Sequence, residues 1–409
     1  MSKSNQTSYQ AAFAFFVILF FMWAFLTEMN GVLVPFVKKV FDFGYTQAIL
    51  VQSCFFIAFA LMAMPASRIL DRIGYRKGII MGLSTMALGC FLFVPASITV
   101  LFPVFLGALF ILATGVTMLQ VAANPYVAVL GDPEKAASRL NLAQGFNSVA
   151  KTIAPVFGSY FILKGMDGLP QAEAAAAVQL PYVGLALALL AVAVIFFFIP
   201  LPDIKDLDAL QETDGKTSDQ SIWGFSHLKL GAVAIFMYVG AEVAIASYMI
   251  NFAGLENIAG IKEADASKYL SMYWGGLMVG RFLGAALLQK MKSQKLLAFN
   301  AVLAIALLFA ATSLSGMAAL WCVVLLGFCN SIMWSNIFTL AIDKLGPLTA
   351  RGSGLLVTAI VGGAVIPFLM GMLADNFGLQ PAYLLLVLCY GYILFYGLKG
   401  YEVSMSDKG

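Results

Sequence analysis

Hydrophobic residues occur along this chain in long runs, separated by short charged or turn-forming segments. Each run is about 20 residues long or longer, the length that a helix needs to cross a bilayer. The pattern predicts twelve transmembrane helices, near residues 11–37, 47–66, 78–95, 100–130, 139–164, 179–200, 225–252, 266–290, 294–313, 317–345, 349–375 and 379–400.

The longest polar interruption is residues 201–224, which divides the hydrophobic runs six and six. We interpret it as a soluble linker between an N-terminal six-helix bundle, residues 1–200, and a C-terminal six-helix bundle, residues 225–409. The first run carries Glu28 in its middle and has no small-residue cleavage site, so we expect a retained helix and not a signal peptide.

A repeat supports this division independently of hydropathy. Asn124, Arg139 and Pro155 recur as Asn336, Arg351 and Pro367, each pair 212 residues apart. The fourth and fifth helices therefore correspond to the tenth and eleventh in a duplicated unit. Parallel repeats of this kind are typical of transporters that bind substrate near the membrane midplane, between the two halves.

Composition sets the class of protein. Of 409 residues, 61% are hydrophobic and 11% are charged, whereas soluble domains are about 45–50% apolar and about 25% charged. The prediction is an all-α membrane protein whose partner is the lipid bilayer. A net charge of +3 gives no reason to expect nucleic-acid binding, and a single histidine, with five cysteines inside apolar runs, argues against an enzyme, a metal site or a resident cofactor.

Lysine and arginine are distributed unevenly between the connections. Seventeen of the 24 lie at the termini or in the even-numbered connections, five lie in the odd ones, and Lys151 and Arg281 lie inside helices. The positive-inside rule then predicts that both termini and the linker are cytoplasmic. We expect a multi-pass protein of a bacterial-type inner (plasma) membrane, acting as a monomer.

Residues 67–77, SRILDRIGYRK, resemble the signature loop between helices two and three of the major facilitator superfamily, with Ser67 where that pattern usually has glycine. Asp71, Arg72 and Arg76 can pin one helix end to its neighbour in one conformation, so we assign them to a conformational switch. A loop that is positive only for topology is the alternative reading.

Four further stretches are similar to the fucose, glucose and galactose cation-symporter family of that superfamily: residues 119–125 (LQVAANP), 139–148 (RLNLAQGFNS), 238–244 (YVGAEVA) and 273–281 (YWGGLMVGR). The resemblance covers essentially the whole chain. It implies a major facilitator fold, with two pseudo-symmetric six-helix bundles, and secondary active import of a hexose by alternating access.

Two positions depart from the fucose-transporting members. Their Asn-Asp in the first helix is Asn30-Gly31 here, and their glutamate in the fourth helix is Gln120. The family's account of proton coupling depends on those two acids. Glutamine at the second position resembles the glucose/galactose members, which favours glucose or galactose as substrate and leaves proton and sodium coupling both open.

Ionisable groups at the bilayer centre are costly and are functional candidates. Glu28 and Glu242 lie in corresponding helices of the two halves, and Lys151 lies midway along the fifth helix. Burial disfavours a charged carboxylate, so either acid could bind and release a proton. The alternatives are a static ion pair with Lys151, or a sodium site formed with the oxygens of Asn30 and Asn124.

Sugars require many hydrogen-bonding groups and aromatic faces. Gln144 and Asn147 share one face of the fifth helix, with Lys151 on the same stripe. The predicted substrate-binding residues are Gln120, Asn124, Gln144, Asn147, Glu242, Asn251, Trp274, Asn330, Trp334 and Asn336.

Arg139 and Arg351 begin the fifth and eleventh helices, near Glu134 and Asp343. They are either solvated anchors or members of a gate, and we include them with the conformational switch. Pro155, Pro367 and the Gly362-Gly363 pair are predicted to bend helices that rock.

The prediction is thus a hexose importer driven by symport of a proton or sodium ion. A passive sugar facilitator and a non-transporting membrane sugar sensor are the alternatives.

Overall fold

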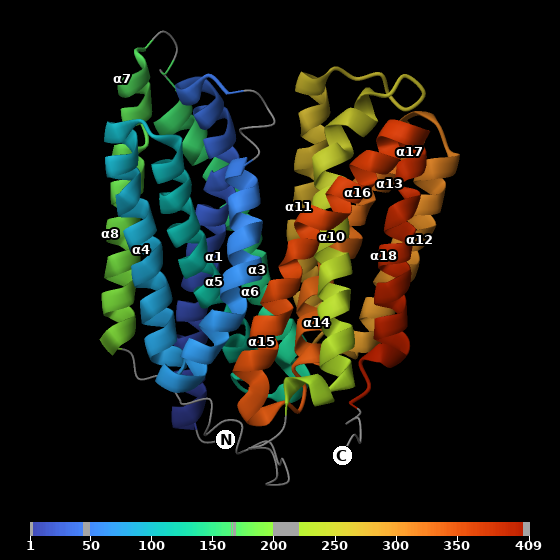
Figure 1. The fold of residues 1–409 in the computed structure, drawn as a ribbon. Coiled ribbons are helices and arrows are strands. Elements are labelled where there is room, and N and C mark those ends of the chain that lie inside the picture. Colours follow the sequence, from blue (N-terminus) through green and yellow to red (C-terminus); the bar gives the residue numbers. More distant parts are fainter. Residues whose placement is uncertain (1–2, 44–49, 165, 167–168, 199–220, 404–409) are drawn as a thin grey trace. The chain divides into compact units, whose positions relative to one another are not determined.

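The computed structural model describes residues 3–43, 50–164, 166, 169–198 and 221–403, and these residues form helices joined by short turns (Figure 1). The α-helices are α1 (Lys3–Phe41), α3 (Leu50–Ile73), α4 (Tyr75–Thr99), α5 (Phe102–Val129), α6 (Ala136–Gly158), α7 (Gln171–Ala176), α8 (Gln179–Phe198), α10 (Ser226–Gly254), α11 (Glu263–Leu287), α12 (Ser293–Ser313), α13 (Gly316–Asn330), α14 (Met333–Ala341), α15 (Thr349–Thr358), α16 (Gly362–Phe377), α17 (Leu379–Ala382) and α18 (Leu384–Phe395). Four 3-10 turns, η1 (Pro133–Lys135), η3 (Ile222–Gly224), η4 (Gly346–Leu348) and η5 (Ala359–Val361), and two π-helical turns, η2 (Ser159–Leu163) and η6 (Tyr396–Gly400), complete them.

Ten helical segments of the described chain are long and apolar enough to span a membrane. The other two predicted transmembrane helices correspond to α6 and α11, which carry Lys151 and Arg281. Several predicted helices are interrupted: α13 and α14 are separated by a turn at residues 331–332, and α15 and α16 by η5. The prediction of an all-α membrane protein is confirmed.

The chain forms two compact units. Unit 1 comprises residues 1–130, 146–210 and 353–358, and unit 2 comprises residues 131–145, 211–352 and 359–409. Each unit therefore includes a short segment from the other half of the sequence. The predicted domains divide the chain at the linker instead, and most of that linker, residues 201–220, lies outside the described residues. That division stays a prediction.

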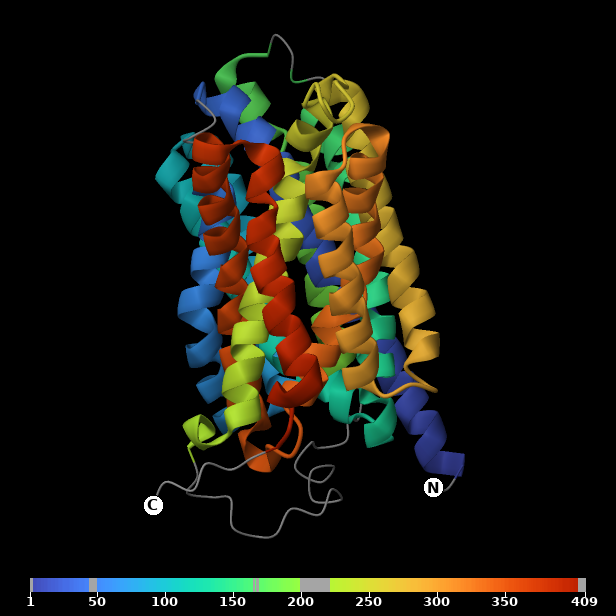
Figure 2. The ribbon, with the colours of Figure 1, turned by 90° about the vertical axis from the view of Figure 1, so that its right-hand side faces the viewer.

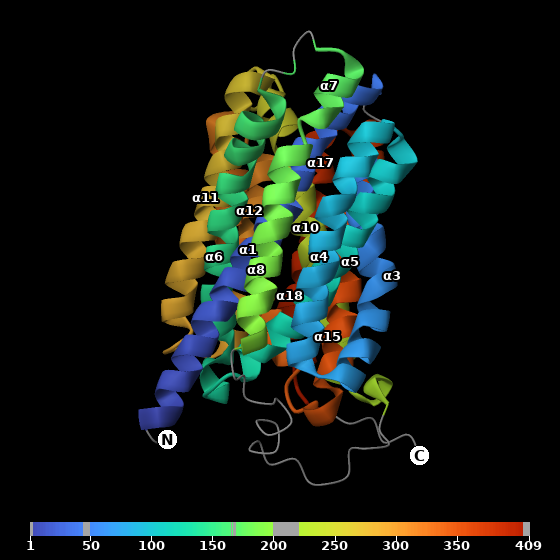
Figure 3. The ribbon, with the colours of Figure 1, turned by 90° about the vertical axis from the view of Figure 1, so that its left-hand side faces the viewer.

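In unit 1, α4 packs against α5 and α8, and α3 packs against α5 (Figure 3). Small residues allow α4 and α5 to approach closely: a Cβ atom added to Gly89 would lie 2.5 Å from the backbone nitrogen of Leu112. Helices in lipid associate largely through such packing, because lipid tails supply no hydrophobic force between them.

In unit 2, α10 packs against α16, and α12 runs beside α18 (Figure 2). The Tyr248 hydroxyl of α10 donates to the carbonyl of Pro367, which lies inside α16, at 3.1 Å. At one end of the unit, Gln380 donates to the carbonyls of Ala311 and Leu314 and so joins α17 to the end of α12.

Local structure repeats where the sequence does. Pro133–Lys135 forms a 3-10 turn that leads into α6, and Gly346–Leu348 forms one that leads into α15. Pro155 lies inside α6, just before the π-helical turn, and Pro367 lies inside α16, just after the interruption at η5. The prolines and the 3-10 turns thus lie at corresponding places in the two repeats, but the irregular turn follows the proline in the first repeat and precedes it in the second.

Candidate functional site

Two amides of unit 1 lie at the same level along their helices. Helices α1 and α5 are antiparallel, with the rings of Phe16 and Tyr126 stacked at 4.5 Å and those of Phe36 and Phe105 at 5.7 Å. Gln120 is six residues before Tyr126 and is therefore level with about residue 22 of α1. The Asn147 amide nitrogen of α6 donates to the Phe20 carbonyl at 3.2 Å, which places Asn147 at nearly the same level.

These two predicted sugar-binding residues differ in exposure. Gln120 is partly exposed, whereas Asn147 is 4% exposed and bonded to the α1 backbone. Gln144 is also buried, three residues before Asn147 on α6. The structure therefore brings Gln120 and Asn147 into one layer, and the bond to Phe20 uses one N–H of the Asn147 amide.

Glu28 and Lys151 lie beyond this layer, in the same direction. Helices α1 and α6 run parallel, because a Cβ atom on Gly158 would meet Val32, twelve residues beyond Phe20. Lys151 lies about 6 Å beyond Asn147, and Glu28 about 12 Å beyond Phe20 along the helix axis. Both side chains are partly exposed and both have interaction partners. Gln120, Asn147, Lys151 and Glu28 thus form a series of polar side chains along the helices of unit 1, which we call the polar ladder.

The structure does not bring Asn30 and Asn124 together. Asn124 lies two residues before Tyr126 and is level with about residue 18 of α1, so Asn30 is about 18 Å farther along. The sodium site suggested for these two side chains is therefore wrong. Each has a buried oxygen with no hydrogen-bond partner among the described residues, and the Asn124 nitrogen donates to the Gln120 carbonyl at 3.0 Å.

In unit 2, Glu242 lies among tyrosines. Its side chain is 8% exposed, and the Tyr238 hydroxyl one turn earlier on α10 lies in the field of its carboxylate but has no hydrogen-bond partner among the described residues. The Tyr273 hydroxyl of α11 donates to the Glu242 carbonyl at 3.4 Å. Asn330 donates to that hydroxyl at 2.9 Å and accepts from the Tyr390 hydroxyl at 2.7 Å. Since both ends of its amide are engaged, this geometry favours a positioning role for Asn330 over the predicted contact with sugar.

The remaining predicted sugar-binding residues are dispersed over unit 2. Asn251 is exposed on α10, and Trp274 is partly exposed, its ring 5.1 Å from that of Tyr273. Trp334 is 7% exposed, and its indole nitrogen has no hydrogen-bond acceptor among the described residues. Asn336 is fully buried and donates to the Ser293 carbonyl at 3.2 Å, as expected of a residue that caps a backbone group.

The predicted switch residues lie at helix ends. Arg72 and Arg76 are exposed, and Asp71 is partly exposed. The Arg76 guanidinium donates to the Phe197 carbonyl at the end of α8 and lies over the Phe197 ring. The superfamily-like loop is thus tied to α8 within unit 1.

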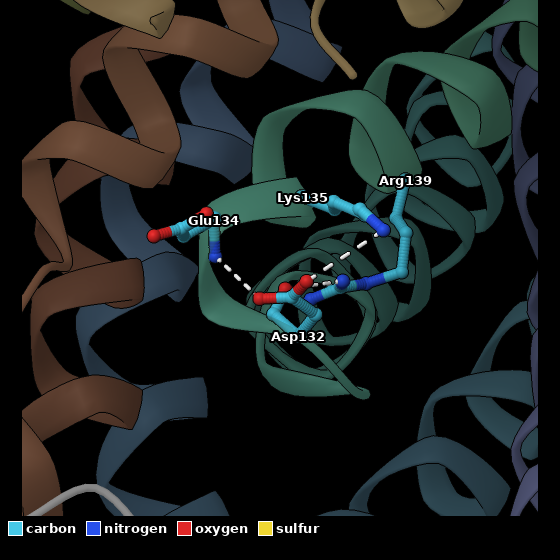
Figure 4. A network of polar contacts seen from close by, with 4 residues as sticks. All are labelled: Asp132, Glu134, Lys135 and Arg139. Carbon is cyan, nitrogen blue, oxygen red and sulfur yellow. Dashed lines mark hydrogen bonds and ion pairs between the residues drawn. The ribbon is translucent and has the colours of Figure 1, made fainter. Parts of the chain in front are cut away.

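Arg139 takes part in a local network at the start of α6 (Figure 4). Its guanidinium donates to the Asp132 carbonyl at 2.5 Å, the Asp132 carboxylate accepts from the Glu134 backbone N–H, and Lys135 lies 3.7 Å from the same carboxylate. Its repeat mate Arg351 is exposed. These contacts favour the anchoring interpretation of Arg139 over a gate with Glu134 or Asp343.

A second polar contact was not predicted. The start of α6 packs on α11 and α14 within unit 2, where the Asn141 amide donates to the Arg281 carbonyl at 2.7 Å and accepts from Ser335 at 3.0 Å. Ser138 donates to the Ala285 carbonyl at 2.6 Å. The only signal in the sequence was the presence of Arg281 inside an apolar helix.

Comparisons with known proteins agree with this architecture. Residues 11–366 match the model of the Major Facilitator Superfamily. A glucose/galactose transporter of Brucella abortus biovar 1 (strain 9-941) is 47% identical over 400 residues, 97% of this chain and 96% of that protein. The L-fucose-proton symporter of Escherichia coli (strain K12) is 34% identical and spans 95% of this chain and 93% of its own length. The crystal structure of the transporter FucP in the outward conformation superposes with a TM-score of 0.85 at 33% identity, covering 95% of this chain and 98% of that one.

Proposed function

Since the chain belongs to the major facilitator superfamily and, within it, to the fucose, glucose and galactose cation-symporter family, we propose that it imports glucose or galactose together with a cation. The observation that carries the proposal is the similarity to the Brucella glucose/galactose transporter over nearly the full length of both chains. The protein is a transporter and not an enzyme.

The polar ladder in unit 1 is consistent with a hexose substrate. Gln120 and Asn147 provide amide donors and acceptors at one level, and Trp23 is tilted against Phe20 at 4.0 Å in the same region. Sugar sites combine a few convergent polar groups with apolar and aromatic surface. Gln120 also stands where the fucose-transporting members have glutamate, which supports a substrate other than fucose.

The co-transported cation is a proton or a sodium ion. Glu28 and Glu242 are the carboxylates that would take it up, because each lies inside a membrane-spanning helix. An intramembrane carboxylate can alternate between a protonated and an ionised form, or can bind a hard cation through its oxygens. Passive facilitation and sugar sensing remain outcomes that the experiment below distinguishes.

We place the protein in a bacterial inner (plasma) membrane, as a monomer with both termini cytoplasmic. The excess of lysine and arginine at the termini and in the even-numbered connections supports this orientation.

Counterflow in proteoliposomes tests substrate and cation together. Vesicles loaded with unlabelled hexose are diluted into labelled sugar, over a panel of hexoses and at varied pH and sodium. We expect glucose or galactose to exchange, and expect uphill accumulation to disappear when the coupling gradient is collapsed. Equilibration that no gradient alters would indicate a facilitator, and the absence of exchange with every hexose would contradict the proposal.

A further inference from the structure

His227 is the one histidine of the sequence, and none of the functions above uses it. It lies in the first turn of α10 and is fully buried, with 0% of its surface exposed. Histidine is the side chain whose charge ordinarily changes near neutral pH. A buried imidazole therefore makes the packing around it depend on pH whenever its site fits one protonation state better than the other.

The site of His227 fits the neutral imidazole. Nε2 lies 2.9 Å from the main-chain carbonyl oxygen of Asp343, in the connection between α14 and α15. A carbonyl oxygen can only accept, so Nε2 carries the ring proton and Nδ1 carries none. Nδ1 is buried and has no hydrogen-bond partner among the described residues. A proton added to Nδ1 would thus create a buried charge and a buried donor without an acceptor, which is unfavourable.

The charged groups near the imidazole do not change this preference. Asp343 and Lys344, on the same connection, act on it with opposite sign, and both are exposed, so solvent screens them. On its own helix, Lys229 follows two residues later and is partly exposed. From η6, the Tyr396 hydroxyl donates to the His227 carbonyl at 3.3 Å and leaves the ring nitrogens untouched. Burial of the ring therefore decides which form the site holds.

The connection that His227 holds has an irregular backbone and leads to a junction of the two units. Lys344 has a φ of 54°, a conformation that is uncommon for a residue with a side chain. The first turn of α15 then packs back on α10, since a Cβ atom on Gly352 would lie 3.5 Å from a methyl carbon of Leu228. The next residues, 353–358, belong to unit 1. His227 thus fixes the segment through which the chain passes from unit 2 to unit 1.

The corresponding connection of the first repeat is held by a different kind of group. There the Arg139 guanidinium donates to the main-chain carbonyl of Asp132 at 2.5 Å. A guanidinium keeps its charge and its donors over the whole range in which histidine titrates. The repeat mate Arg351 is exposed, and in the second repeat the carbonyl of the connection is bonded by a titratable ring. The two repeats therefore attach equivalent connections with a permanent donor and with one that responds to pH.

We propose that His227 is a pH-sensitive attachment of the α14–α15 connection to α10. The neutral ring holds the Asp343 carbonyl. The protonated ring has to turn toward water to hydrate Nδ1, and it then gives up that carbonyl. Acid therefore releases the connection of the second repeat, whereas Arg139 keeps that of the first in place. In the proposed orientation this end of the helices is cytoplasmic, so an acid cytoplasm slows import, a consequence that rests on the proposed function.

Alkylation of an introduced cysteine tests the attachment without any transport. Ala350, the second residue of α15, is 4% exposed, so Ala350→Cys in a chain freed of its native cysteines reports release of the connection. Ala137, the second residue of α6, is 3% exposed and follows the connection held by Arg139, so Ala137→Cys is the matched control for the titration of the thiol itself. In detergent, we expect the rate at Ala350→Cys, divided by that at Ala137→Cys, to rise at least about threefold from about pH 7.5 to about pH 5.5.

Two variants separate titration of the ring from simple packing. His227→Gln keeps a neutral N–H donor that cannot gain a proton, so the labelling ratio should stay low at both pH values. His227→Phe removes the donor and should raise the ratio at both pH values to the level that the parent chain reaches in acid. A ratio that is independent of pH in the parent chain, or that changes as much in His227→Gln, would overturn the proposal. A ratio that falls in acid would also overturn it, since the imidazolium would then be held by the Asp343 carboxylate.

Counterflow with the same pH on both sides of the membrane tests the consequence for transport. We expect the rate of the unmodified protein to fall at least about twofold more than that of His227→Gln between about pH 7.5 and about pH 5.5. Any titration of Glu28 or Glu242 affects both proteins and cancels in this comparison. Equal pH profiles would overturn the regulatory role. Failure of the unmodified protein to exchange any hexose would contradict the proposed function, and the labelling ratios would still decide the attachment.

Discussion

The duplication places two corresponding segments against the opposite half of the sequence, and the two contacts differ in chemistry. Residues 131–145 pack within unit 2, and residues 353–358 pack within unit 1. At the first contact Asn141 bonds to both Arg281 and Ser335. At the second, the residue 212 positions later, Ser353, makes one bond to the Val121 carbonyl at 2.9 Å.

The second contact relies on fit. Gly354 follows Ser353, and a Cβ atom there would lie 2.6 Å from the Cβ of Ser67. Ser67 is the position where the superfamily's loop usually has glycine. In this chain the glycine of the contact is Gly354 on α15, and its missing side chain leaves the space that the Ser67 side chain of α3 occupies. One contact of the pair is held by polar groups next to a charge, and the other by steric complementarity.

The two intramembrane carboxylates extend this asymmetry. Glu28 is partly exposed on α1, with Lys151 in the same ladder, whereas Glu242 is buried among tyrosines of unit 2. These two carboxylates lie in corresponding helices of the two repeats, but their surroundings differ. The two repeats thus share a helical order and differ in the chemistry around their intramembrane carboxylates.

The largest effect is expected from Glu28→Gln. Removing the ionisable group should reduce uphill accumulation at least about tenfold, the size of an ordinary coupling free energy, while counterflow stays within about twofold of the unmodified protein. Glu242→Gln is the matched comparison. Accumulation that survives in Glu28→Gln and is lost in Glu242→Gln would assign coupling to unit 2 alone.

Asn141→Ala should have the next largest effect, and on stability. It removes two buried hydrogen bonds and leaves Ser335 without its acceptor, which costs about 1–3 kcal/mol. Thermal unfolding in detergent, followed by intrinsic fluorescence, measures the loss. An unchanged midpoint would show that the polar contact adds nothing to packing.

The sequence predicted the helices, the repeat and the family because those depend on patterns within one stretch of chain. Hydrophobic runs fix where helices lie, and the 212-residue repeat fixes which helices correspond. The contact of Asn141 with Arg281 joins residues 140 positions apart, and its register depends on how two helices pack. The same limit explains the error over Asn30 and Asn124, which share a residue type and a favourable chemistry but lie at different levels of α1 and α5.

Gly354→Ala should destabilise unit 1 by about 1–2 kcal/mol, because the new methyl group overlaps Ser67 and neither backbone can move freely. The double variant Ser67→Gly/Gly354→Ala has the glycine that is usual in the superfamily at position 67 and should recover most of the loss. The unfolding midpoints of the four proteins in this cycle measure the coupling. Equal losses with and without Ser67→Gly would contradict the steric explanation.

Ser353→Ala should have the smallest effect, and its size decides whether the two contacts really differ. It removes one bond, worth about 0.5–1.5 kcal/mol, from a carbonyl that lies within α5. Alanine also favours helix more than serine does, by a few tenths of a kcal/mol, so the net loss should fall below about 1 kcal/mol.

Ser335→Ala makes the same chemical change at the other contact, but it leaves the buried Asn141 oxygen without its donor and should cost more. Because both variants delete one hydroxyl from a fully buried serine, the difference between their unfolding midpoints isolates the partner as the cause. Equal losses would mean that the polar contact is no stronger than the steric one.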